Sequence, residues 1–245
     1  MKYFQQLPAV LRKLDHLVFH STKYRDIDFA REHGITNFSV IPCGASEYWF
    51  NVAVDRSFRS RHGIPEQSFL FLTVGSFTGL KGHVELAKAF SRLELAEGQH
   101  ATLILNGNDV QAVDLSMGGL IGKFIELVRA YGVQYSFGRI FKKFLGVGTT
   151  PRRIAIRVNK SQPDKLVLVT DFPRHELTQA FMAADLFVFA SNVEYSPLVL
   201  YESAASGTPF LSVNVGNAEE IADNLSLCCI NSAIDWANTP ALTLV

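Results

Sequence analysis

Short apolar runs alternate along the chain with longer segments of helical pattern. The runs that indicate strands cover residues 16–21, 38–42, 69–75, 101–107, 165–170, 185–191 and 209–214, with a weaker one at 225–230. They are continuous rather than alternating, which is typical of strands covered on both faces. Helices are predicted between them at 23–33, 82–96, 117–145, 174–184, 197–206 and 217–223. This order predicts an α/β fold, a doubly wound parallel Rossmann-like sheet.

Residues 1–60 supply too few elements for a sheet of their own. They contain two predicted strands and one or two helices, whereas residues 61–245 account for the Rossmann-like unit. We therefore expect a short N-terminal appendage that is the end of another domain, followed by a linker. Two strands are marginal without further packing, so residues 1–50 are expected to self-associate, to bind a partner chain or to be disordered.

Composition excludes several classes of function. The 245 residues contain 23 basic and 23 acidic side chains, a balance that gives no reason to expect a nucleic-acid partner. Cys43, Cys228 and Cys229 lack the spacing of a metal site and are expected to be reduced thiols. The sequence has no secretory pattern and no apolar run as long as a membrane span. A cytoplasmic location is predicted.

One segment interrupts the pattern, a basic insertion at about residues 108–163. Between residues 127 and 163 there are eight basic side chains and no acidic one. Two readings stay open. The segment is a solvated insertion that lengthens one crossover, or residues 139–160 form a basic amphipathic element that contacts anionic lipid at the inner face of a membrane.

Candidate binding residues follow the strand at 69–75. Ligands of open parallel sheets bind at the carboxyl ends of strands, beside helix N-termini. The stretch VGSFTGLKGH places Gly75, Ser76 and Gly79 in a tight turn and Lys81 at the start of the next helix. A lysine beside helix amides suits phosphate, although glycine turns of this kind are common.

A second group follows the strand at 185–191. Ser196 is expected to cap the next helix with Pro197 as its first residue. The backbone amides of Leu198 and Val199 would then face an anion.

Two carboxylates, Glu194 before this helix and Glu202 within it, are expected to point into one crevice. Alternatively, Glu194 is a surface charge and Glu202 is solvated or bonded to a backbone amide.

After the strand at 165–170, Phe172 and Arg174 are candidate contacts for a nucleotide base. Packing of Phe172 in the core is the alternative reading.

Taken in order, these pieces resemble the donor domain of family 4 retaining glycosyltransferases. The series comprises Gly75 with Lys81-Gly82 six residues on, Glu194 and Glu202 eight residues apart, GTP at 207–209 and VGNAEE at 215–220. The segment from residue 16 to residue 50 is similar to the end of that family's N-terminal domain and its linker. The resemblance covers about residues 14–222 and implies the GT-B architecture of two facing Rossmann domains.

The resemblance also implies roles for individual residues. Glu194 would hold hydroxyls of the donor sugar, Glu202 would accept hydrogen bonds from the ribose, and Lys81 would neutralise the diphosphate. Glu194 and Lys81 would thus serve catalysis. The implied reaction is transfer from a nucleotide diphosphate sugar to a sugar or lipid-linked acceptor, with retention at the anomeric carbon, in polysaccharide or glycolipid biosynthesis. No metal or other cofactor is expected.

The chain departs from the family pattern at several points. Ser76 stands where the family usually has arginine, and Pro197 offers no amide in the piece that is usually glycine-rich. Most of an N-terminal acceptor domain does not match. The chain is thus read as a glycosyltransferase or its donor-binding part, inactive in isolation. The alternative is a non-catalytic nucleotide-sugar-binding or partner subunit.

Overall fold

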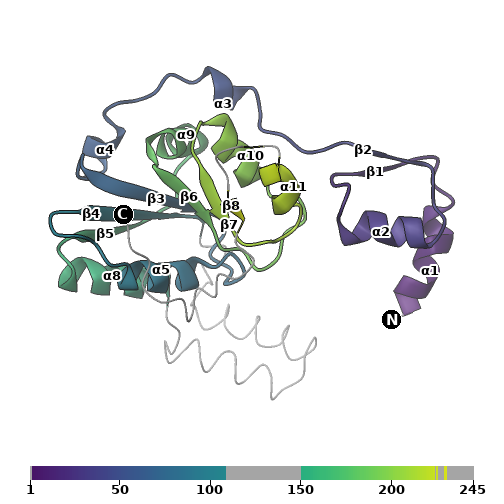
Figure 1. Cartoon of the computed structure of the whole chain (residues 1–245), viewed down its shortest axis with the longest axis horizontal. Coiled ribbons are helices and arrows are strands. Elements are labelled where there is room, and N and C mark those ends of the chain that lie inside the picture. Colours follow the sequence, from purple (N-terminus) through teal and green to yellow (C-terminus); the bar gives the residue numbers. More distant parts are fainter. Residues whose placement is uncertain (1, 109–149, 224, 226–228, 231–245) are drawn as a thin grey trace, which may run out of the picture.

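A computed structural model describes residues 2–108, 150–223, 225 and 229–230. These residues form a Rossmann-like unit and a small N-terminal segment that are joined by an extended linker (Figure 1). The predicted helix at 117–145 lies outside the described residues, as do the basic side chains of Arg129, Arg139, Lys142 and Lys143.

The described residues form a main sheet of six strands, and each strand lies within or beside a predicted run. The order across the sheet is β5-β4-β3-β6-β7-β8, and every neighbouring pair is parallel. The prediction of a parallel α/β fold is therefore confirmed. The strands are β3 (Ser68–Val74), β4 (His100–Asn106), β5 (Lys165–Thr170), β6 (Leu186–Phe189), β7 (Phe210–Ser212) and β8 (Cys229–Ile230).

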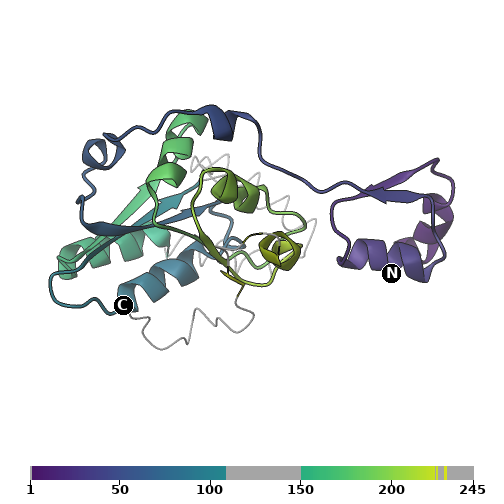
Figure 2. The same cartoon turned by 45° about the horizontal axis from the view of Figure 1, so that its top comes forward.

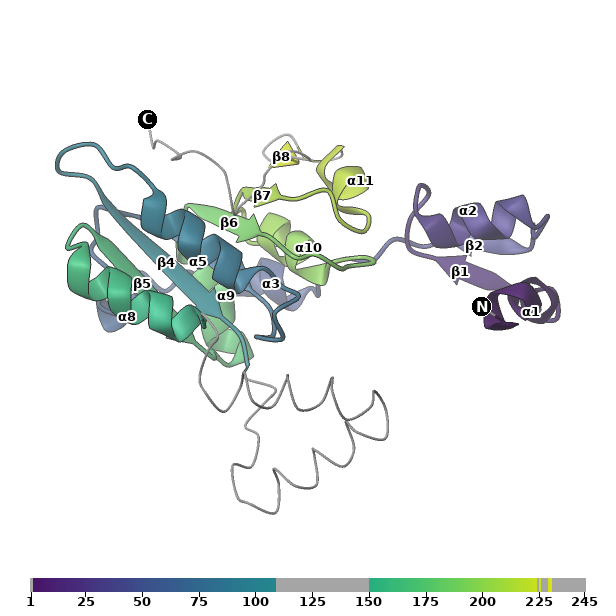
Figure 3. The same ribbon diagram turned by 90° about the horizontal axis from the view of Figure 1, so that it is seen from below.

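Helices cover both faces of this sheet (Figures 1 and 3). One face carries α5 (His83–Arg92) and α8 (Pro151–Ser161), and the other carries α9 (Arg174–Ala183), α10 (Leu198–Ala205) and α11 (Ala218–Asp223). Successive side chains of a strand point to opposite faces. Thus Ile104 of β4 packs in the core beneath α9 and α10, whereas Leu103 and Leu105 pack beneath α5 and α8. Strands buried on both sides explain the continuous apolar runs.

Helix α8 corrects the end of the predicted basic insertion. The side chain of Thr150 accepts a hydrogen bond from the Arg153 amide, and Pro151 occupies the first turn, so the sequence starts a helix here. Its inner face packs against the sheet through Ile154, Ala155 and Val158. Residues 151–161 are therefore the regular crossover helix that leads into β5, and their basic side chains lie on its outer face.

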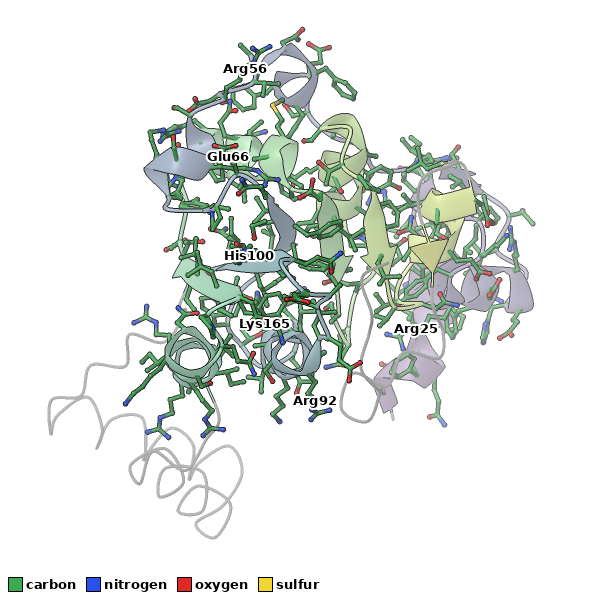
Figure 4. The ribbon with its side chains drawn as sticks, turned by 60° about the vertical axis from the view of Figure 1, so that its left-hand side comes forward. Arg25, Arg56, Glu66, Arg92, His100 and Lys165 are labelled. Atoms are coloured by element: carbon green, nitrogen blue, oxygen red, sulfur yellow. The ribbon has the colours of Figure 1, made fainter. Side chains whose placement is uncertain are left out.

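Lys165, the first residue of β5, lies between the two helices of this face (Figure 4). Its ammonium group donates to the carbonyl oxygen of Ser91 at 3.2 Å. Burial lowers the pKa of this lysine. This hydrogen bond joins the C-terminal end of α5 to the N-terminal end of β5.

The N-terminal segment forms a body of its own beside the main unit (Figure 2). It consists of α1 (Lys2–Leu11), β1 (Leu17–Phe19), α2 (Arg25–Glu32) and β2 (Phe38–Val40), with β1 and β2 paired in parallel. Its core contains Phe19, Ile27, Ala30 and Ile35, while Val18 and Ile41 are exposed. Thus the sheet is covered on one face only.

The linker includes two short helices, α3 (Tyr48–Asn51) and α4 (Phe58–Arg61). Trp49 and Phe58 are buried against the main sheet, and the ring of Trp49 meets that of Phe181 edge-on. The linker therefore crosses the α9–α10 face as part of its core. Among the described residues, no helix has the length and apolarity needed to cross a bilayer.

The loops that follow β3 and β6 are packed backbone to backbone. Gly82, the N-cap of α5, has a φ of +70°, and a Cβ atom there would lie 2.0 Å from the carbonyl oxygen of Ala190. The Asn192 amide donates to the Leu80 carbonyl oxygen at 2.8 Å. Only glycine at position 82 allows this approach.

We expect Gly82→Ala to destabilise the protein by about 2–5 kcal/mol. This sums a left-handed alanine, about 1–2 kcal/mol, and forced separation of two backbones, about 1–3 kcal/mol. Gly79→Ala is the matched control, because Gly79 has a φ of +85° and open space around its Cα. The control should lose only the first contribution. Urea unfolding of the parent and both variants measures the difference, and equal losses would contradict the packing argument.

Candidate functional site

The candidate site lies where the strand order of the sheet reverses. From β3 the chain proceeds to β4 and β5 on one side, and it returns with β6 on the other side of β3. Connections after β3 and β6 therefore leave in opposite directions, and in such sheets a ligand-binding crevice is expected at the carboxyl ends of the two strands. The predicted residues Gly75, Ser76 and Lys81 follow β3, and Glu194 follows β6.

Lys81 and Glu194 meet directly across this reversal. The ammonium nitrogen of Lys81 forms an ion pair with Oε1 of Glu194. The side chains are 27% and 15% exposed, so both are shielded from bulk water but still reachable. The sequence predicted both residues as ligands of one donor, yet it gave no sign that they contact each other.

The stem of Lys81 lies over Gly75. A Cβ atom on Gly75 would come within 3.1 Å of Cγ of Lys81. The Gly75 amide in turn donates to the carbonyl oxygen of Asn106 at the end of β4. Ser76 is half-buried beside it, at the exit of the strand. The glycine therefore lets the lysine fold back toward the crevice.

Two residues that the sequence analysis did not single out fix this edge of the sheet. His83 is buried beneath the loop and its pKa is lowered to about 4, chiefly by burial and also by Lys81, so its ring is neutral at pH 7. Asn106 accepts hydrogen bonds through Oδ1 from the Phe172 amide at 2.7 Å and from the Thr170 hydroxyl at 3.0 Å. Their only sequence signal is their position at a strand end and a helix start.

Helix α10 begins one residue later than predicted. Pro197, not Ser196, is its N-cap, and the hydroxyl of Ser196 is buried without a hydrogen-bond partner among the described residues. The predicted capping role of Ser196 is therefore wrong. Leu198 and Val199 occupy the first turn, where helix amides have no acceptor within the helix. These two amides remain candidates for binding an anion.

Glu202 lies one turn further along α10 and is half-buried. Burial raises the pKa of its carboxyl group, and the nearby charge of Arg174 opposes that rise. No hydrogen bond or ion pair to its carboxylate is found within the described part of the chain. The guanidinium of Arg174 also lies over the ring of Tyr48, 5.4 Å from the centroid. The structure thus brings Glu202 and Arg174 together.

Phe172 packs against the linker. Its ring lies 5.9 Å from that of Phe58 and 4.8 Å from that of His62, between ring centroids. His62 and Arg61 in turn bind Glu176 of α9, at 2.5 and 2.8 Å. These contacts are those of the packing alternative, and a base contact by Phe172 stays a prediction.

The described residues also contain a cavity on another side of α10. It has a volume of about 530 Å³ and lies between residues 42–50, α10 and α11. Neither Lys81, Glu194 nor Glu202 lines it. No group of three or more His, Cys, Asp or Glu side chains in the described ranges could hold a metal ion. That donor binding needs no metal stays a prediction.

The comparisons with known proteins concern the fold and part of the sequence. A family model described as glycosyl transferases group 1 matches residues 120–239, a little under half of the chain. A search of curated proteins finds no match.

Similar solved structures include three that cover almost all of this chain. A glycosyltransferase from Rickettsia africae has a TM-score of 0.61 at 14% identity, over 96% of this chain and 54% of its own. Sucrose-phosphate synthase from Thermosynechococcus elongatus has 0.57 at 19%, over 94% and 48%. HepE from Anabaena, in complex with UDP, has 0.57 at 13%, over 94% and 53%.

The chain thus spans about half the length of the solved structures it matches. Its parallel sheet, flanked by helices on both faces, is the Rossmann-like fold of the C-terminal domain of GT-B glycosyltransferases.

Proposed function

We propose that this chain binds a nucleotide diphosphate sugar and serves as the donor-binding part of a glycosyltransferase. The observation that carries the proposal is the partly buried Lys81–Glu194 pair at the reversal of the strand order. A cation and a carboxylate at one point suit a ligand with both phosphate oxygens and hydroxyl donors. Lys81 would bind the diphosphate, and Glu194 would accept hydrogen bonds from the sugar.

The ribose is assigned to Glu202. A half-buried carboxylate without donors is unfavourable in the free protein, and burial raises its pKa. The two hydroxyls of a ribose would supply those donors. Arg174, close to Glu202 and above the ring of Tyr48, then lies toward the base.

Electrostatic stabilisation of the leaving diphosphate is the chemistry this site would supply. As the glycosidic bond breaks, negative charge grows on the diphosphate, and fixed donors aimed at that charge lower the barrier. Lys81 and the amides of Leu198 and Val199 would be those donors, since Ser76 brings no charge. Glu194 would orient the sugar rather than attack it, and orientation alone contributes strongly to rate.

The comparisons support this class of donor. The matching family model describes glycosyl transferases, and the structure of Anabaena HepE was determined with UDP. Retention at the anomeric carbon, independence from metals, and a sugar or lipid-linked acceptor are our proposals for the whole reaction. In GT-B proteins the catalytic cleft closes between two Rossmann domains, so the present chain alone is expected to bind donor without transferring sugar.

Helix α8 favours a contact with an anionic lipid surface. Arg152, Arg157 and Lys160 are exposed on its outer face, and Ile156 between them is 69% exposed. Basic side chains with an apolar residue among them suit anionic headgroups.

The exposed Val18 and Ile41 favour self-association of residues 1–50, which light scattering of the purified chain would detect.

Replacing Arg152, Arg157 and Lys160 of α8 by glutamate should abolish binding to anionic vesicles. Each basic side chain near such a surface contributes about 1 kcal/mol, so the parent should bind vesicles with 30% phosphatidylglycerol at low salt. Cosedimentation with these vesicles and with pure phosphatidylcholine measures it. Lys23→Glu, a charge change in the N-terminal segment just before α2, is the control. If the parent protein cosediments with neither type of vesicle, the proposed lipid contact is refuted.

Glu202→Gln should stabilise the free protein at pH 7 and weaken nucleotide binding. The raised folded-state pKa means that Glu202 favours folding when protonated, below the unfolded value of 4.5, and loses that contribution as pH rises through the folded pKa. The variant's gain in melting temperature should therefore be largest at pH 7 and shrink toward pH 4. Loss of a charge-assisted hydrogen bond predicts about tenfold weaker binding of UDP, GDP or ADP, whichever the parent binds.

Thermal unfolding across this pH range, with and without nucleotide, measures both effects of Glu202→Gln. The exposed Glu97 provides the control, Glu97→Gln, which should alter neither. A variant that binds nucleotide as tightly as the parent would remove Glu202 from the ribose site.

Lys81→Met should reduce the preference for diphosphates. Without the ammonium group, a nucleoside diphosphate should lose about tenfold or more in affinity, while a nucleoside monophosphate should lose less. Isothermal titration with UDP and UMP, or the corresponding pair for the preferred base, compares the two. Lys88→Met, on the following helix and outside the crevice, is the matched control. Equal losses for both nucleotides would place Lys81 away from the second phosphate.

A further inference from the structure

The loop that carries Glu194 is in contact with the N-terminal segment. Figure 3 shows the connection between β6 and α10 reaching toward that segment. The hydroxyl of Tyr24 donates to the backbone carbonyl oxygen of Glu194 at 2.9 Å. The backbone amide of His20 donates to the hydroxyl of Tyr195 at 3.1 Å. The ring of Tyr195 lies 5.1 Å from that of Tyr24 and 5.6 Å from that of His20.

A carboxylate on α11 anchors the same segment. Glu220 accepts hydrogen bonds from the Ser21 hydroxyl at 2.6 Å, the Thr22 hydroxyl at 2.7 Å and the Thr22 amide at 3.1 Å. Burial alone would raise the pKa of Glu220, but these donors bring it below its usual value. Charge-assisted bonds of this kind are stronger than neutral ones. The segment is thereby fixed to the unit that carries the donor site.

The loop before α11 also holds Tyr195. The Asn217 amide donates to the carbonyl oxygen of Tyr195 at 2.9 Å, and the Asn217 side chain donates to the carbonyl oxygen of His20 at 3.3 Å. A Cβ atom on Gly216 would lie 2.4 Å from the Tyr195 carbonyl oxygen. Glu194 and Tyr195 are thus enclosed by residues 20–24, residues 216–217 and Lys81.

We propose that residues 20–24 position Glu194, the residue whose carboxylate is assigned to the donor sugar. Tyr24 is the main positioning residue of this segment. Tyr24 fixes the backbone of Glu194, so that the Glu194 side chain faces Lys81 before the donor arrives. This inference rests on the proposed function of Glu194. Coupling is reciprocal, so a bound donor sugar must also tighten the contact between residues 20–24 and α11.

Tyr24→Phe in the full chain tests the proposal, because it removes one hydroxyl and keeps the ring. The proposed ribose and diphosphate contacts do not involve Tyr24, so the affinity for the free nucleoside diphosphate should stay within about twofold. The additional affinity that the sugar provides should fall about threefold to tenfold, the range for one lost hydrogen bond. Titrations with UDP and UDP-glucose, GDP and GDP-mannose, and ADP and ADP-glucose measure both quantities.

Lys23→Ala is the matched control. Lys23 lies in the same segment and pairs with Asp223 of α11 at 3.5 Å, but both side chains are largely exposed. Among the described residues, no hydrogen bond or ion pair joins either side chain to the Glu194 loop. This variant should keep the full contribution of the sugar. A purely structural role of the segment would instead make both variants lose free nucleotide and nucleotide sugar alike, and that pattern would overturn the proposal.

Hydrogen exchange separates this proposal from the donor assignment. In the ligand-free protein, Tyr24→Phe should speed amide exchange in residues 194–196 and leave residues 101–106 of β4 unchanged. Unchanged exchange at 194–196 would overturn the positioning role whatever the ligand. If exchange responds as expected but the parent binds none of the six nucleotides, the proposed donor function fails while the structural coupling stands.

Discussion

The parallel pairing of β3 with β6 brings together the two loops that carry Lys81 and Glu194. Because β4 and β5 follow on one side of β3 and β6 returns on the other, the loops after β3 and β6 leave the sheet as neighbours. Lys81 and Glu194 are 113 residues apart in sequence, and this pairing is what brings them into contact. The close approach of Gly82 to Ala190 holds these two loops together. The strand order of the sheet therefore places a cation and a carboxylate side by side.

Much of the fold could be predicted because a strand that is buried on both faces has a continuous apolar sequence. The runs at 69–75, 101–107 and 165–170 are apolar for that reason, and their strands form as expected. Helix α8 was missed because its apolar positions, Ile154, Ala155 and Val158, are few and stand among arginines and a lysine. A narrow apolar stripe still suffices to pack a helix on a sheet when Thr150 and Pro151 start it.

The site could be predicted only in part, for a different reason. Glycines, a lysine at a helix start and glutamates in an apolar run are local signals, and they pointed to Gly75, Lys81, Glu194 and Glu202. The partners of these residues are set by contacts between distant segments, which a single sequence does not display. No local pattern connects Tyr24 with Glu194, 170 residues further on. Likewise, Ser196 has the residue type of a cap, but the chain turns at Pro197 instead.

The two glutamates of the site differ in how the free protein accommodates them. Glu194 is paired with Lys81, so its charge is compensated before any ligand binds. Among the described residues, the only charge that acts on Glu202 is the more distant Arg174, and burial raises the pKa of Glu202. An unpaired, half-buried carboxylate costs folding free energy, and a ligand with hydroxyl donors would recover that energy on binding. In the proposed donor complex, Lys81 would divide its charge between Glu194 and the diphosphate, which favours a ligand whose sugar hydroxyls bind Glu194 at the same time. A nucleotide sugar would supply ribose hydroxyls to Glu202 and sugar hydroxyls to Glu194, whereas a free nucleotide would supply only the ribose hydroxyls.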